Sequence, residues 1–166
     1  MKKLPLTITF ILLSLFSFAQ SLPDFDAIKL EKKEDYNAAA ENAVMTASNY
    51  LFSTPLDKND INRQNCMLYI LRWMEGTPDY SFTFDEQATK FAKKNSDLLG
   101  LYMAGMTKFV LENKSDSKDQ NKIRLNALKI VINYAREEKN KVKMNGEFKK
   151  AMEAESKGKL EEYLAL

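Results

Sequence analysis

The sequence predicts an all-α protein, a single compact bundle of five or six helices. Glycine and proline are scarce, at 5 and 4 of 166 residues, so few positions interrupt a helix. Alanine, leucine, lysine, glutamate and methionine, which favour helices, are frequent. Apolar residues recur at spacings of three and four rather than two along most of the chain.

Residues 1–19 have the pattern of a cleaved secretory signal peptide. A positively charged start, Met1–Lys3, precedes the apolar stretch Leu4–Phe18, and Ser17 and Ala19 are the small residues that signal peptidase accepts. The stretch is shorter than a membrane span, and no positive stop-transfer flank follows it. We therefore expect an exported protein, periplasmic or extracellular, with no transmembrane segment after signal cleavage.

Cleavage also balances the charge of the chain. Two of the 25 basic residues lie in the signal peptide, so the mature chain carries as many basic residues as acidic ones, of which there are 23. A neutral chain gives no electrostatic case for binding nucleic acid. We expect no nucleic acid partner.

A flexible, polar lead-in is expected over 20–34, followed by a helical domain over 35–166. The first helix should run over Asp35–Phe52 and stop before Pro55. The second should begin after the N-cap Asp60 and end at Gly76. Its buried stripe is expected to consist of Ile61, Gln64, Met67, Leu68, Leu71 and Met74.

The period switches to two over Tyr80–Phe84, which predicts an extended segment too isolated to form a sheet. Asp85 should then cap a short helix that ends near Lys94. A fourth helix starts at Asn95 or Ser96, and its nearly continuous apolar face is typical of a central helix.

After a polar loop, Glu112–Asn121, a fifth helix is expected over about Asn121–Glu138. A last helix over about Asn145–Tyr163 is interrupted by Gly158. Two segments also resemble each other, Asn65–Trp73 and Asn126–Tyr134. They predict two helical hairpins related by an internal repeat, and chance similarity of helical patterns is the alternative.

The composition excludes several chemistries. The chain has no histidine, which excludes a Ser-His-Asp triad, a Cys-His dyad and an ordinary zinc site. Cys66 is the single cysteine, too distant from the cleavage site for a lipoprotein and typical of a small buried hydrophobe. Asp57–Asp60 and Asp116–Asp119 lack the ligand positions of a calcium loop. We expect no catalytic residue, cofactor or metal site.

The segment from Trp73 to Phe84 is the candidate binding site. It joins the only tryptophan to a rigid turn and three more aromatic residues, and such residues on an ordered irregular segment are good binding anchors. In the alternative interpretation the segment crosses the bundle and fills its end with rings. The candidate binding residues are Trp73, Thr77, Pro78, Asp79, Tyr80 and Phe82.

The stretches Arg72–Tyr80, Asn95–Gly100 and Met106–Asn113, with a signal that ends in Phe18–Gln20, resemble a family of small exported all-helical bacterial proteins. The resemblance covers most of the mature chain. It implies export, and it implies no activity, cofactor or site residue, because none is assigned to that family.

These observations predict a non-catalytic protein-interaction or binding module of the bacterial envelope, with a protein partner. One alternative is a periplasmic enzyme inhibitor or immunity protein that inserts the loop Glu112–Asn121. The other is a binder of a small apolar ligand, or an enzyme that uses carboxylates.

Overall fold

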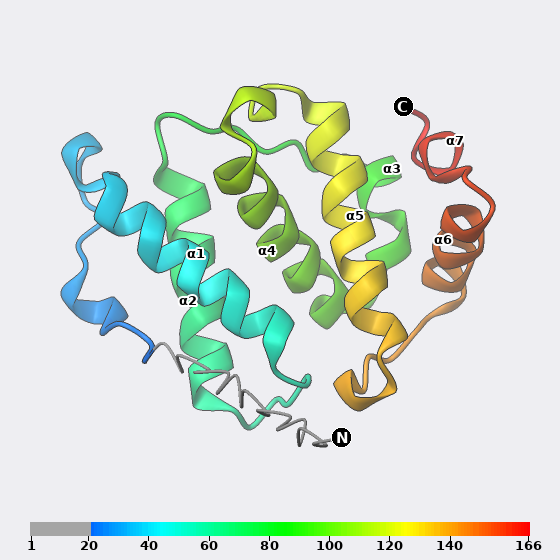
Figure 1. Cartoon of the computed structure of the whole chain (residues 1–166), viewed down its shortest axis with the longest axis horizontal. Coiled ribbons are helices and arrows are strands. Elements are labelled where there is room, and N and C mark those ends of the chain that lie inside the picture. Colours follow the sequence, from blue (N-terminus) through cyan, green and yellow to red (C-terminus); the bar gives the residue numbers. More distant parts are fainter. Residues whose placement is uncertain (1–20) are drawn as a thin grey trace, which may run out of the picture.

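Seven α-helices build the part of the chain that the structure, a computed structural model, describes, residues 21–166 (Figure 1). These residues contain five short 3-10 helices and no strand, which confirms the predicted all-α bundle. The expected signal peptide, 1–19, lies outside the described residues. The helices are α1 Ala38–Ser53, α2 Ile61–Gly76, α3 Glu86–Thr89, α4 Ser96–Glu112, α5 Gln120–Arg136, α6 Gly146–Ser156 and α7 Leu160–Leu164.

The lead-in packs against α2, in contrast to the flexible segment that its polar sequence predicts. It contains two 3-10 helices, the first of which carries the buried Phe25. The ring centroids of Phe25 and Tyr69 lie 4.8 Å apart. Near its end, the Tyr36 hydroxyl donates a hydrogen bond to the Leu30 carbonyl at 3.2 Å. Phe25 anchors the segment to α2, because burial of its aromatic ring stabilises the packed conformation even though the neighbouring residues are polar.

Polar caps fix the starts of the first two long helices. Asn37 and Asp60 accept hydrogen bonds from the free amides at the beginnings of α1 and α2. The buried Arg63 of α2 donates to the Leu51 carbonyl at 2.8 Å and to the Thr54 carbonyl at 3.0 Å. This guanidinium therefore satisfies the carbonyl end of α1 and joins the two helices into a hairpin.

Helix α4 is the central helix, as predicted. It packs against α1, α2 and α5, and Figure 1 shows it between the α1–α2 hairpin and α5. A Cβ at Gly105 would lie 3.0 Å from the Ala127 carbonyl oxygen, so the two backbones approach closely only because this residue has no side chain. The α4–α5 pair is the second hairpin, and the internal duplication itself stays a prediction.

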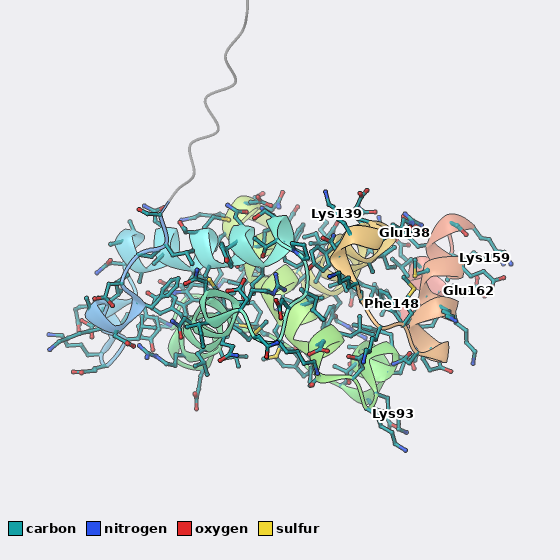
Figure 2. The ribbon with its side chains drawn as sticks, turned by 90° about the horizontal axis from the view of Figure 1, so that it is seen from below. Lys93, Glu138, Lys139, Phe148, Lys159 and Glu162 are labelled. Carbon is teal, nitrogen blue, oxygen red and sulfur yellow. The ribbon has the colours of Figure 1, made fainter. Side chains whose placement is uncertain are left out.

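Helices α6 and α7, together with the 3-10 helix Lys90–Ala92 after α3, form the remaining side of the bundle, where Lys90–Ala92 contacts α4 and α6, and α7 contacts α5. Gly158, with φ of +68°, separates α6 from α7, which confirms the predicted interruption. Figure 2 labels Phe148 on α6, whose buried ring lies 6.0 Å from the ring of Phe91. Lys159 and Glu162 point outward in the same view. This end of the molecule is thus an ordinary amphipathic layer with a charged outer side.

The interior consists of two apolar clusters that meet at α4. One joins α1, α2 and the lead-in, and the other joins α4 to the helices that follow it. Tyr80 and Phe82, which follow α2, pack against both clusters. The extended segment after α2 therefore closes the seam between the two halves of the bundle.

Candidate functional site

Trp73 does not present its ring to solvent. The side chain is 0% exposed, in the last turns of α2. Its ring centroid lies 5.3 Å from that of Tyr80 and 6.3 Å from that of Phe82, and both of these rings are half-buried. This burial gives no support to Trp73 as a binding anchor, because a side chain without exposed surface contacts only its own fold.

The segment 77–84, called the strap below, is tied to helices on both sides. The Tyr80 hydroxyl donates to the Glu41 carboxylate of α1 at 2.9 Å. Gln120 of α5 holds the strap at two points: its amide nitrogen donates to the Ser81 carbonyl at 3.0 Å, and its amide oxygen accepts from the Thr83 backbone at 3.2 Å. The strap fills the end of the bundle with rings, as the alternative interpretation predicted.

The remaining candidate residues form the turn at the start of the strap. Thr77 is half-buried, and Pro78 and Asp79 are exposed. Lys118 donates a hydrogen bond to the Asp79 carbonyl, so the turn is fixed from the polar loop before α5. Pro78 and Asp79 alone offer too little apolar surface for a binding anchor.

The polar loop that follows α4 is also tied to the fold. Lys114 forms an ion pair with Glu41 at 2.7 Å, and Lys122 forms one with Asp116 at 2.7 Å. Ser117 is buried and donates to the Lys114 carbonyl at 2.8 Å. The loop lies against α1 and α5, and its contacts give no support to an inhibitor that inserts it into an enzyme.

The structure instead exposes the face of α2 that was expected to be buried. Ile61 is 61% exposed and Leu68 is 59% exposed, and the two side chains share one face of the helix because they are seven residues apart. The predicted stripe was therefore wrong for these residues and for the exposed Gln64. The buried face of α2 consists of Arg63, Cys66, Tyr69, Ile70 and Trp73.

An apolar hollow of about 430 Å³ lies beside this exposed face, between α2 and the start of α4. Met67 lies over Gly100 of α4, where an added Cβ would be 2.9 Å from the Met67 methyl carbon. The apolar side chains that line the hollow are Leu51, Leu56, Met67, Leu68 and Leu101.

Charged residues mark the rim of the hollow. Lys58, from the loop before α2, forms an ion pair with Asp97 of α4 at 3.3 Å. Asp57 also lines the rim and takes part in no ion pair among the residues described. The hollow therefore combines an apolar floor with a polar edge, the arrangement typical of an interface.

A second hollow, of about 310 Å³, lies on the other side of Leu68, between α2 and the lead-in. Its α2 side carries Asn62, Asn65 and Arg72. The Arg72 guanidinium lies 5.9 Å from the centre of the Tyr69 ring and 3.9 Å from the Asp26 carboxylate. Leu68 is thus the ridge between two concavities, one apolar and one polar.

The titratable groups give little support to catalysis. Burial raises the pKa of the Cys66 thiol to about 12, so the thiolate that a nucleophile requires is absent at neutral pH. A backbone hydrogen bond from Glu31 lowers the pKa of Asp35, and the neighbouring Lys150 lowers that of Glu147. Residues 21–166 contain no cluster of three or more acidic or cysteine side chains that could hold a metal ion.

None of the helices in the described range 21–166 is both long enough and apolar enough to cross a membrane. Comparisons of the chain with models of known protein families, with curated proteins and with solved structures each found no significant match. The resemblance to small exported bacterial proteins stays a prediction.

Proposed function

We propose that the protein is an exported, non-catalytic protein-binding module of the bacterial envelope, and that it binds its partner with the exposed face of α2. The observation that carries the proposal is the exposure of Ile61 and Leu68 on one side of a helix whose other side is already buried. One apolar side is sufficient to pack a helix against the core of its own protein, so a second apolar side is available for contact with a partner.

The energetics favour this surface over others on the molecule. Full burial of a leucine or isoleucine stabilises a complex by about 1.5–3 kcal/mol relative to its exposure. The hollows on either side of Leu68 provide the concave surface that a partner's side chains can fill. Among residues 21–166, the other large exposed apolar side chains, such as Phe84 and Met144, are less exposed than Ile61 and Leu68.

Site-specific photo-crosslinking in the native envelope tests the proposal. A photoreactive residue at position 68 should crosslink to one dominant protein, whereas the same residue at Met144, an exposed apolar position outside α2, should not. Ile61→Asp should abolish the crosslink from position 68 without changing the circular dichroism of the protein. Equal crosslinking from 68 and 144, or a crosslink that Ile61→Asp leaves intact, would contradict the proposed surface.

A small apolar ligand is the second candidate, and the hollow beside α4 is the observation that favours it. Its volume of about 430 Å³ lies within the range of known small-molecule sites, and leucine and methionine line it. Gly100→Leu would fill it, so binding of a fluorescent apolar probe should fall while Ile61→Asp leaves that binding unchanged. Probe binding that survives Gly100→Leu would exclude this hollow as the ligand site.

A further inference from the structure

Two segments that lie side by side in the bundle are rich in lysine. Residues 90–95 lead from α3 to α4, and residues 139–145 lead from α5 to α6; each segment contains three lysines and no acidic residue. The Asn95 side chain donates a hydrogen bond to the Lys143 carbonyl at 2.8 Å, and the Asn145 side chain donates to the backbone of the first segment. The fold therefore brings together cationic side chains that are about 50 residues apart in the sequence.

Four of these lysines form the surface that we call the lysine patch: Lys93, Lys94, Lys141 and Lys143. All four are exposed, and none takes part in an ion pair within residues 21–166. Figure 2 shows Lys93 projecting from the lower edge of the bundle, whereas Lys139 lies at the opposite edge and is not counted. Lys90 is not counted either, because its ammonium lies against the ring of another residue.

The acidic residues that follow the two segments in the sequence are paired with other lysines. Asp97 forms an ion pair with Lys58 at 3.3 Å, and Glu147 forms one with Lys150 at 2.7 Å. The lysine patch therefore keeps a local positive charge, although the mature chain as a whole is formally neutral.

The backbone at two of the patch lysines has a conformation that favours glycine. The φ angle is +59° at Lys94 and +53° at Lys141, and Ala165 is the only other residue within 21–166, glycine apart, with a positive φ. A side chain with a Cβ atom is disfavoured in this left-handed region. A residue that keeps such a conformation against its local preference indicates a use for its side chain.

An exposed apolar side chain accompanies the lysine patch. Met144 follows Lys143 and is 37% exposed, one of five large apolar side chains exposed among residues 21–166. Lysines beside an exposed apolar residue are typical of proteins that bind a membrane surface. There the ammonium groups contact lipid phosphates, and the apolar side chain enters the boundary between headgroups and acyl chains. A nucleic acid would supply the phosphates but no apolar layer for Met144.

We propose that the lysine patch and Met144 bind the surface of a membrane that contains anionic phospholipids. None of these residues belongs to the exposed face of α2, so the inference does not depend on the function proposed for that face. Each lysine close to an anionic membrane surface strengthens binding by about fivefold. Four lysines therefore give a reversible contact, which added salt weakens by screening the charges.

Co-sedimentation with lipid vesicles tests the proposal. The sample is residues 20–166, which include both apolar clusters of the fold, because the apolar stretch before them would itself bind lipid. The protein should sediment with vesicles of phosphatidylcholine and phosphatidylglycerol, and it should stay in solution with vesicles of phosphatidylcholine alone. Protein that does not sediment with the anionic vesicles at low salt overturns the proposal.

Two glycine substitutions separate binding from stability. Lys94→Gly and Lys141→Gly each remove a charge and relieve a left-handed backbone. Each should weaken vesicle binding by about fivefold, whereas the urea midpoint of unfolding should stay unchanged or rise. The control is Lys33→Gln, which removes the charge of an exposed lysine in the lead-in and should leave vesicle binding unchanged. Equal weakening by Lys33→Gln overturns the lysine patch as the binding surface.

Met144→Ser distinguishes a membrane from a soluble polyanion. It should weaken binding to the anionic vesicles and leave binding to double-stranded DNA, measured at the same salt concentration, unchanged. A photoreactive residue at position 144 should label lipid rather than one dominant protein. If the protein binds DNA as tightly as it binds the vesicles and Met144→Ser changes neither, the partner is a polyanion in general and the membrane surface is wrong.

Discussion

At the end of α2, Gly76 leaves room for the ring of Tyr36. A Cβ at this position would lie 1.8 Å from the Tyr36 hydroxyl oxygen. Gly76→Ala should therefore displace the ring and break its hydrogen bond to the Leu30 carbonyl. We expect the free energy of unfolding to fall by about 1–3 kcal/mol, as in other overpacked sites, measured by urea denaturation.

Two variants control for the effect of the added methyl group. Gly146→Ala adds the same group at the start of α6, where the added Cβ would have no atom within 4 Å apart from its chain neighbours and the backbone of its own helix, and should be neutral or stabilising. In a Tyr36→Ala background, Gly76→Ala should lose its extra cost, because the clashing ring is gone. An equal cost in both backgrounds would show that the close contact is not the cause.

Trp73 is expected to act through stability rather than through binding. Trp73→Ala removes a fully buried ring from the junction of the two clusters, and should lower the free energy of unfolding by about 3–5 kcal/mol. Leu68→Ala, on the exposed face of the same helix, should change it by less than about 0.5 kcal/mol. Unchanged stability in Trp73→Ala, with weaker partner binding, would restore the role predicted from sequence.

The strap is held by residues far from it in the sequence. Gln120 is a suitable residue for a test, because its side chain bonds the strap backbone directly. Gln120→Ala removes both hydrogen bonds to the backbone of Ser81 and Thr83. Losing about 1 kcal/mol of local stability should raise the hydrogen-exchange rate of the Thr83 amide by about fivefold.

The control for the strap is Gln64→Ala, which removes an amide that bonds the Lys58 carbonyl in another loop. It should leave the exchange rate of the Thr83 amide unchanged. If both variants raise the exchange rate of the Thr83 amide equally, the prediction that the Gln120 side chain stabilises the strap is contradicted.

The helices could be predicted from sequence more reliably than their faces. In α5, Ile123, Leu128 and Val131 recur at a helical spacing and all three are buried, so periodicity indicates the buried face of that helix. In α2, apolar residues lie on two sides, and a period of 3.6 cannot decide between them. The choice depends on Tyr69 and Trp73, whose larger rings pack against the lead-in and the strap.

The exposed face of α2 could not be predicted from sequence for the same reason, because apolar residues lie on two sides of that helix. Ile61 and Leu68 have the spacing of core residues, and their exposure follows only from the tertiary position of α2 at the edge of the bundle. The burial of Arg63 gave no sequence signal either, because its acceptors are backbone carbonyls at the end of α1. Local sequence patterns do not predict the burial of a residue whose contacts are made with backbone groups far away in the chain.

The whole molecule should lose stability in alkaline solution. It contains no histidine, and burial raises the pKa of Cys66 to about 12 and that of Tyr69 to about 12. Burial also raises the pKa of Tyr102 and Tyr163. The folded protein keeps these protons at a pH where the unfolded chain, with ordinary values of about 8.5 for cysteine and about 10 for tyrosine, has released them.

The sign follows from the proton balance of the two states. Above about pH 8.5 the unfolded state binds fewer protons than the folded state, so the free energy of unfolding falls as the pH rises. The contribution of these groups is complete below that pH and is lost as the pH approaches their folded-state pKa values. Each group adds a slope of at most about 1.4 kcal/mol per pH unit.

Urea denaturation of the wild type and of Cys66→Ala at a series of pH values isolates the thiol. Between about pH 8 and pH 9 the unfolded cysteine loses much of its proton, whereas each unfolded tyrosine stays about nine-tenths protonated, so the larger share of the slope there belongs to Cys66. Cys66→Ala should flatten the slope in this interval, and the tyrosines should keep it steep above about pH 10. The comparison uses slopes because the smaller side chain also leaves a cavity, whose cost does not depend on pH. An unchanged slope between these pH values would mean that the thiol ionises as easily in the folded protein as in the unfolded chain, which its burial among α1 and α2 does not allow.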